Sequence, residues 1–233
     1  MIRGVIFDLD GTLFDRATTV ERVAHSQFRA YQEEFGKVGI DHYVQRLINL
    51  DARGYTSKYI VFKTLLAELN VETLDVSDMV DDFYVRYHQN AIVYDEALET
   101  LELLNSQPFK VGMITNGHTA IQQRTIQVLN LDKYFHSILI SEQEGIRKPD
   151  AAIFQRAAQR IGVTPHQAVY IGDHPETDVI GAKQAGLKAI WRRSSYWREP
   201  EEADAVIDRL SEVLPFLSAR RAASEIKRKV EQD

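Results

Sequence analysis

Short apolar runs alternate with helical segments along most of this sequence, and this feature limits the possible folds most strongly. Four runs after Tyr94 have the length and composition of buried strands, and a helical pattern precedes each of them. Together with the run Val5–Phe7, this alternation predicts an α/β fold with a Rossmann-like, three-layer core and a parallel sheet. The expected strands after Tyr94 are 111–114, 137–140, 168–171 and 188–191, and the expected helices are about 96–105, 119–129, 150–161 and 176–185.

A long all-helical segment separates the first expected strand from the others. From Thr18 onward, apolar residues recur at spacings of three and four, as they do on one face of a helix. Thr18 and Glu21 have the spacing of a capping box, and Gly36 and Gly39 would end the first helix. We therefore expect an inserted all-helical domain. The expected bounds are 1–15 and 92–217 for the α/β core, 16–91 for the insert, and 218–233 for a peripheral helix or tail.

Composition narrows the kinds of partner. Acidic residues exceed basic ones by six, which argues against a broad contact with nucleic acid or with an anionic membrane surface. The chain has no cysteine, so disulfides and thiolate metal ligands are excluded. No apolar run approaches the roughly 20 residues of a membrane-spanning helix, and the first run is too short for a signal peptide. We expect a cytoplasmic monomer or homodimer that acts on a small molecule.

Four polar motifs occur in a particular order, and three of them directly follow an expected strand. Because the carboxyl ends of parallel strands meet at one edge of a sheet, these motifs are expected to lie close together. Taken singly, each has a simpler explanation, such as a helix cap, a turn or a solvated loop. The motifs are Asp8-Leu9-Asp10-Gly11-Thr12, Thr115-Asn116-Gly117, Arg147-Lys148-Pro149-Asp150, and the segment from Gly172 and Asp173 to Asp178.

This ordered set resembles the four motifs of the haloacid dehalogenase-like superfamily. The helical insert after the first motif is similar to the helical-cap branch, known as C1 or subfamily IA. The resemblance spans nearly the whole chain, and Ala151 is a small departure, since relatives often carry proline there. It implies a magnesium-dependent phosphatase that forms an aspartyl-phosphate intermediate, with a cap that closes over the site.

The chemistry of phosphate monoester hydrolysis assigns roles to three residues. Asp8 is the expected nucleophile, because a carboxylate needs no deprotonation near neutral pH. Asp10 would protonate the leaving oxygen and later accept a proton from water. Lys148 would place a compact positive charge against the nucleophile and the phosphoryl group.

The remaining motif residues fit the needs of a phosphate and a metal ion. Thr115, Asn116 and the backbone of Gly117 are expected to bind phosphoryl oxygens. Mg²⁺ prefers oxygen ligands, which Asp8, the Asp10 carbonyl and Asp173 can supply. The family resemblance implies that Asp178 helps to hold this metal shell and the lysine.

The sequence does not identify the substrate. We expect a small phosphorylated metabolite, such as a sugar phosphate, a phosphoglycolate-like acid or a nucleoside monophosphate. Arg53 and Lys58, in a polar break between two helices of the insert, are candidates for contacts with its distal part, although the break could be a simple connector.

Rival functions are a 2-haloacid dehalogenase, a phosphomutase and a non-catalytic binding module on the same fold. A dehalogenase has no leaving alkoxide to protonate and no need of Asp10. A receiver-type domain also combines an aspartate, a threonine and a lysine around magnesium, but it lacks an insert of this size.

Overall fold

A six-stranded parallel sheet forms the centre of the α/β unit in the computed structural model, which describes residues 1–218. The strand order is β3-β2-β1-β4-β5-β6, and all neighbouring strands run parallel. The predicted α/β fold with a parallel sheet is confirmed. The strands are β1 (Gly4–Phe7), β2 (Lys110–Thr115), β3 (Ser137–Ile140), β4 (Ala168–Gly172), β5 (Lys188–Arg192) and β6 (Ala205–Ile207).

All five strands expected from apolar runs are present, and β6 is an addition. Three residues are too few for a periodic signal, so β6 could not be recognised from the sequence. It exists because its backbone pairs with β5, with Ala205 opposite Ile190. The expected tail lies outside the described residues, apart from Ser218.

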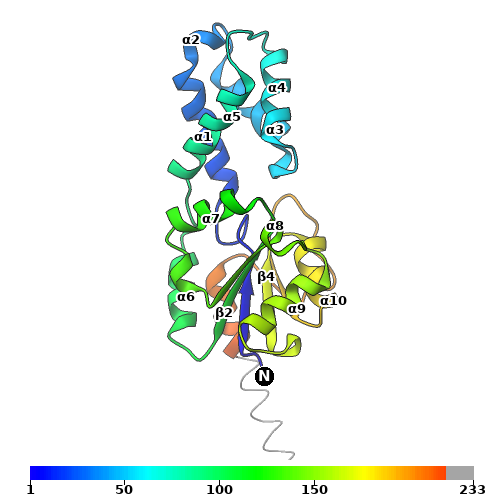
Figure 1. Cartoon of the computed structure of the whole chain (residues 1–233). Helices are drawn as coiled ribbons and strands as arrows, with labels where there is room; N and C mark the ends of the chain where they lie inside the picture. The colour runs from blue at the N-terminus through cyan, green and yellow to red at the C-terminus, as the bar shows by residue number, and fades with distance from the viewer. Residues whose placement is uncertain (219–233) are drawn as a thin grey trace, which may run out of the picture. The chain divides into compact units, whose positions relative to one another are not determined.

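Helices cover both faces of the sheet. Ile6 packs into a buried cluster with Phe154 of α9 and Ala182 of α10, whereas the neighbouring side chains of β1 point to the opposite face. Figure 1 shows α6 and α9 on opposite sides of the strands. The helices of this unit are α6 (Ala97–Asn105), α7 (Thr119–Val128), α8 (Ser141–Glu144), α9 (Ala151–Arg160) and α10 (Gly181–Gln184).

Two helices of this unit differ from the sequence-based expectation, one in its first residue and the other in its helix type. The helix after the third motif starts at Ala151, and Asp150 caps it by accepting a hydrogen bond from the backbone N–H of Ala152, so Pro149 precedes the cap. The helix expected over 176–185 is a π-helical turn, Pro175–Ile180, followed by the short α10. Such turns accompany functional sites more often than plain helices do.

The second compact unit, Asp15–Ile92, contains only helices. Its first helix is capped by Asp15, whose carboxylate accepts hydrogen bonds from the N–H and hydroxyl of Thr18, so the expected cap at Thr18 was wrong. Phe28, Phe35 and Tyr43 pack ring against ring in its core. We call this unit the helical unit. Its helices are α1 (Arg16–Ala30), α2 (Gln32–Phe35), α3 (Ile40–Asp51), α4 (Lys58–Glu68) and α5 (Val76–Gln89).

A buried ionic cluster joins three segments of the helical unit. The guanidinium of Arg16 donates to both oxygens of Asp51, at 2.8 and 3.2 Å, and the ammonium of Lys58 pairs with the same carboxylate. The side chain of Asp51 is only 2% exposed. Burial would raise the pKa of Asp51, but the charges and hydrogen bonds of Arg16 and Lys58 outweigh this effect and lower that pKa below its ordinary value.

We expect Asp51→Asn to reduce the free energy of unfolding by about 3–5 kcal/mol at neutral pH, because two cations then lose their shared carboxylate. A carboxyl group whose pKa is depressed by folding stabilises the protein above the unfolded-state value, about pH 4, and this stabilisation is lost as the pH falls through the folded-state pKa. Denaturant unfolding at a series of pH values should therefore give free energies of unfolding for the wild type and the variant that converge at acid pH. Asp81→Asn, at an exposed position of α5, should change little at either pH.

Candidate functional site

Three buried carboxylates meet at the carboxyl edge of the sheet. Asp8 directly follows β1 and Asp173 directly follows β4, and these strands are neighbours in the sheet. Asp178 comes from the π-helical turn that follows β4. Each of the three residues offers a carboxylate oxygen, and these oxygens all lie within 4.8 Å of one another. The first and fourth motifs, which are far apart in the sequence, therefore form one acidic cluster.

The ammonium of Lys148 lies against this cluster and uses all three of its donors. It donates to Asp8 at 2.6 Å, to Asp178 at 2.7 Å and to the hydroxyl of Tyr170 at 2.8 Å. Its side chain is 3% exposed. Lys148 is therefore a buried ion-pair partner of two carboxylates, and the alternative of a solvated loop cation does not apply.

The electrostatics of the cluster show an excess of negative charge. Burial would lower the pKa of Lys148, but the adjacent charges of Asp178 and Asp8 outweigh it and raise that pKa above its ordinary value. Burial raises the pKa of Asp8, an effect that Lys148 opposes and that Asp178 and Asp173 reinforce. Three carboxylates face one ammonium, so their full ionisation leaves two negative charges. A divalent cation would balance this surplus.

Short contacts hold the fourth motif together. Asp178 uses one oxygen for Lys148 and accepts a hydrogen bond at the other from the backbone N–H of His174, at 3.0 Å. A Cβ at Gly172 would lie 2.4 Å from the Asp178 carboxylate, so only glycine permits this approach. The ring of His174 accepts hydrogen bonds from the N–H groups of Glu176 and Thr177. This histidine therefore caps the π-helical turn.

Gln122 of α7 connects the first and second motifs. Its amide donates to the Asp10 carboxylate at 2.7 Å and to the Thr115 hydroxyl at 2.6 Å. Asp10 is partly exposed, unlike Asp8, and Thr115 is fully buried. Both residues therefore lie at the same edge of the sheet as the acidic cluster.

Asn116 and Gly117 make contacts within the protein at the positions where phosphate contacts were expected. The side chain of Asn116 forms two hydrogen bonds of 3.0 Å with the backbone of Lys148, donating to its carbonyl and accepting from its N–H. The N–H of Gly117 donates to the hydroxyl of Ser141. Asn116 thus fixes the loop that carries the lysine, a function that its sequence position did not indicate.

Arg53 and Lys58 belong to the helical unit. Lys58 is buried and ion-paired with Asp51. Arg53 has a left-handed backbone conformation with φ of 59°, between Ala52 at 45° and Gly54 at 91°. The left-handed region is unfavourable for Ala52 and Arg53, although not for Gly54, and such backbone strain often accompanies functional segments.

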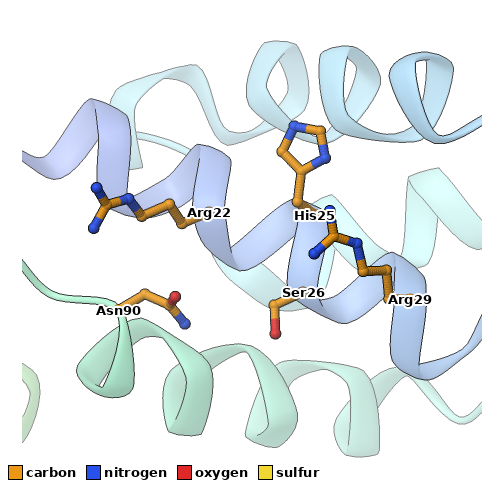
Figure 2. A pocket seen from close by; sticks show the side chains of 5 residues that line it. All are labelled: Arg22, His25, Ser26, Arg29 and Asn90. Carbon is orange, nitrogen blue, oxygen red and sulfur yellow. The ribbon is translucent and has the colours of Figure 1, made fainter.

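A further hollow in the helical unit involves none of the predicted site residues. It is lined by Arg22, His25, Ser26 and Arg29 of α1 and by Asn90, which follows α5. Figure 2 shows their side chains pointing in several directions, without a common focus. Its lining contains cations but no carboxylate, so it has a different chemistry from the motif site.

The family of the chain can be established by comparison. A family model of haloacid dehalogenase-like hydrolases matches residues 2–186. The chain belongs to the haloacid dehalogenase-like hydrolases. The family resemblance seen in the four motifs is therefore confirmed. Among the described residues of this hydrolase, no helix combines the length and apolar character needed to cross a membrane.

Relatives of this hydrolase include phosphatases and a dehalogenase. A glyceraldehyde 3-phosphate phosphatase of Methanopyrus kandleri is 31% identical over 226 residues, which cover 92% of this chain and 96% of the relative. A phosphoglycolate phosphatase of Aquifex aeolicus is 28% identical and covers 82% of this chain and 85% of its own length. The structure of a 2-haloacid dehalogenase from Pseudomonas syringae has a TM-score of 0.63 at 33% identity, covering 94% of this chain and 99% of that chain.

The motifs of this hydrolase did not reveal two of its site residues. Tyr170 lies within β4, where an aromatic residue in an apolar run is typical of core packing. Burial and the surrounding negative charges raise the pKa of its phenol well above the ordinary value, so the phenol stays protonated. Gln122 has no motif around it, and only its side-chain contacts show its place in the site.

Proposed function

We propose that this protein is a magnesium-dependent phosphatase that hydrolyses phosphate monoesters of small metabolites through an aspartyl-phosphate on Asp8. The observation that carries the proposal is the buried Lys148 between Asp8 and Asp178, with Asp173 beside them. This group offers a carboxylate nucleophile, a fixed positive charge and oxygen ligands in one place. The two phosphatase relatives support the same reaction class.

Asp8 attacks phosphorus in this reaction, and the bond to the leaving oxygen breaks. Lys148 neutralises charge on Asp8 and on the phosphoryl oxygens. The hydroxyl of Thr12 donates to the second oxygen of Asp8 at 3.3 Å, which restricts rotation of the carboxylate. The nucleophile is therefore already oriented before substrate binds, which lowers the entropic cost of attack.

Asp10 serves as the acid and base. It protonates the leaving alkoxide and then takes a proton from the water that hydrolyses the aspartyl-phosphate. Gln122 holds its carboxylate next to Thr115, which we propose as a phosphate ligand. Asn116 fixes the loop that carries Lys148. The backbone of Gly117 is proposed to bind a phosphoryl oxygen together with Thr115.

The residues of the acidic cluster fit Mg²⁺. The ion is small, prefers oxygen ligands and is bound by few carboxylates. Asp8, Asp173 and the Asp10 carbonyl would hold it, and Asp178 would support this group while it binds Lys148. When bound, the ion would neutralise phosphoryl charge.

The helical unit is proposed to act as a cap that excludes bulk water from the reaction. Arg53 remains a proposed contact to the distal part of the substrate, whereas the ammonium of Lys58 is buried and already paired with Asp51, so we do not propose it for that contact. The relatives favour small phosphorylated acids and sugars as the substrate class. The reaction and its cofactor are proposed to operate in the cytoplasm.

The similarity to a dehalogenase makes halide displacement the second candidate. Halide leaves carbon without a proton, so that reaction gives Asp10 no role. The contact between Asp10 and Gln122 therefore favours the phosphatase. A phosphomutase would use the same residues and pass the phosphoryl group to a second substrate hydroxyl.

The test is a panel of esters that includes glyceraldehyde 3-phosphate, phosphoglycolate, phosphoserine and a nucleoside monophosphate. We expect phosphate release with Mg²⁺ and none after chelation with EDTA, restored by added Mg²⁺. Parallel assays measure halide release from 2-haloacids and isomers of hexose phosphates. Chloride release without phosphate release would replace the phosphatase by the dehalogenase, and isomer formation would replace it by the mutase.

A further inference from the structure

Trp191 and Arg192, at the carboxyl end of β5, contact the two loops that carry the site carboxylates. The indole N–H of Trp191 donates to the backbone carbonyl of Asp173 at 2.6 Å. The guanidinium of Arg192 donates to the backbone carbonyl of Gly11 at 2.8 Å. The side chains of these two adjacent residues thus bind backbone carbonyls of the fourth and first motifs.

The two loops touch each other at this point. Gly11 has a φ of 83°, and a Cβ there would lie 2.6 Å from an oxygen of the Asp173 carboxylate. A shift of the Gly11 backbone would therefore change the position of Asp10, the preceding residue in the chain, and the contact with Asp173. The hydrogen bond from Arg192 therefore holds the backbone of the residue that follows Asp10 and packs closely against Asp173.

Arg192 is itself held in place by Tyr94. Its guanidinium carbon lies 3.6 Å from the centre of the Tyr94 ring, which is a close cation–π contact. Its Nε is buried and has no hydrogen-bond acceptor among the described residues. An apolar side chain beside Tyr94 would avoid this unsatisfied N–H donor. The stability of the fold therefore does not by itself explain why an arginine occupies this position.

We propose that Trp191 and Arg192 are positioning residues, which fix the backbone carbonyls of Asp173 and Gly11 and so set the geometry of the metal-binding and acid–base carboxylates. This inference rests on the proposed function. Arg192 provides the directed hydrogen bond and the stacked plane, which lysine cannot reproduce. Neither residue is required to touch the substrate.

The main test compares Arg192→Ala with Arg193→Ala. Arg193, one residue away, is exposed and pairs with Glu199 and Asp208. Its guanidinium carbon also lies 5.8 Å from the centre of the Trp191 ring, so Arg193→Ala removes a cation beside the same tryptophan but keeps the hydrogen bond from Arg192 to Gly11. We expect Arg192→Ala to lower kcat about 10- to 100-fold, with little change in KM for the ester, and to weaken Mg²⁺ binding by about 10-fold. Mg²⁺ affinity is measured by isothermal titration calorimetry without substrate.

Chemical rescue separates positioning from a general loss of structure. Guanidinium at concentrations far below those that unfold the protein should restore part of the kcat of Arg192→Ala, because the ion can stack on Tyr94. Arg192→Lys should stay impaired. Trp191→Phe, which keeps the ring and removes the N–H donor, should weaken Mg²⁺ binding in the same direction.

Values of kcat and Mg²⁺ affinity for Arg192→Ala equal to those of Arg193→Ala would overturn the inference. So would a loss that matches the unfolded fraction in thermal denaturation and does not respond to guanidinium. If the wild type hydrolyses no ester but Arg192→Ala still weakens Mg²⁺ binding relative to Arg193→Ala, the proposed function fails and the positioning role stands.

Discussion

Asp8→Asn is expected to lower kcat for phosphate release by roughly 10⁴- to 10⁶-fold, the range seen when a residue of a covalent catalytic unit is removed. An amide oxygen is a far weaker nucleophile than a carboxylate, so the aspartyl-phosphate cannot form. The substitution keeps the size of the side chain, and the hydrogen bond from Lys148 can persist to the amide oxygen. Substrate affinity should therefore change much less than kcat.

The measurement is phosphate release at saturating substrate, together with mass spectrometry of protein quenched during turnover. Wild-type protein should carry one phosphoryl group on the peptide containing Asp8, and the variant should carry none. Asp132→Asn makes the same chemical change at an exposed carboxylate and should retain wild-type kcat. A phosphorylated Asp8→Asn variant, or one with near-normal kcat, would rule out Asp8 as the nucleophile.

Lys148→Met is expected to reduce both activity and stability. Its removal leaves Asp8 and Asp178 buried and close together without their shared cation. We expect a loss of about 3–5 kcal/mol in the free energy of unfolding, the usual cost of breaking a buried ion pair. The loss of transition-state charge stabilisation should lower kcat by about 10²- to 10³-fold.

Denaturant unfolding and steady-state kinetics test this expectation, with Lys110→Met as the control at an exposed lysine of β2. Mg²⁺ should stabilise Lys148→Met more than the wild type, because the variant has one more uncompensated negative charge at the cluster. Unfolding free energies that are equal for Lys148→Met and Lys110→Met would contradict the ion-pair arrangement.

The strands and the motifs at their ends were predictable because their signals are local. A buried strand of a parallel sheet is a continuous apolar run, and the polar residues that follow it are recognisable as its carboxyl end. This reasoning placed Asp8 and Asp173 at the ends of β1 and β4, where the structure has them. The helix caps were less predictable, because Asp15 and Thr18 are both suitable caps and only the backbone geometry selects Asp15.

The contacts that orient the candidate site could not be predicted in this way. Gln122 and Asp10 are separated by 112 positions, and Arg192 and Gly11 by 181. Tyr170 and Trp191 are apolar enough to pass for core residues, and a single polar atom on each makes the contact with the site. No periodicity or short motif carries such information.

The amino-acid sequence by itself therefore determined the α/β class, the helical insert, and the order of motifs that bring carboxylates and a lysine to one edge of the sheet. The tertiary structure alone decided which backbone and side-chain groups hold those residues, including Tyr170 against Lys148, Gln122 against Asp10, and Arg192 against Gly11. The physical reason is that strand and motif signals arise from neighbouring residues, whereas these hydrogen bonds depend on the strand order and on the packing of segments far apart in the chain.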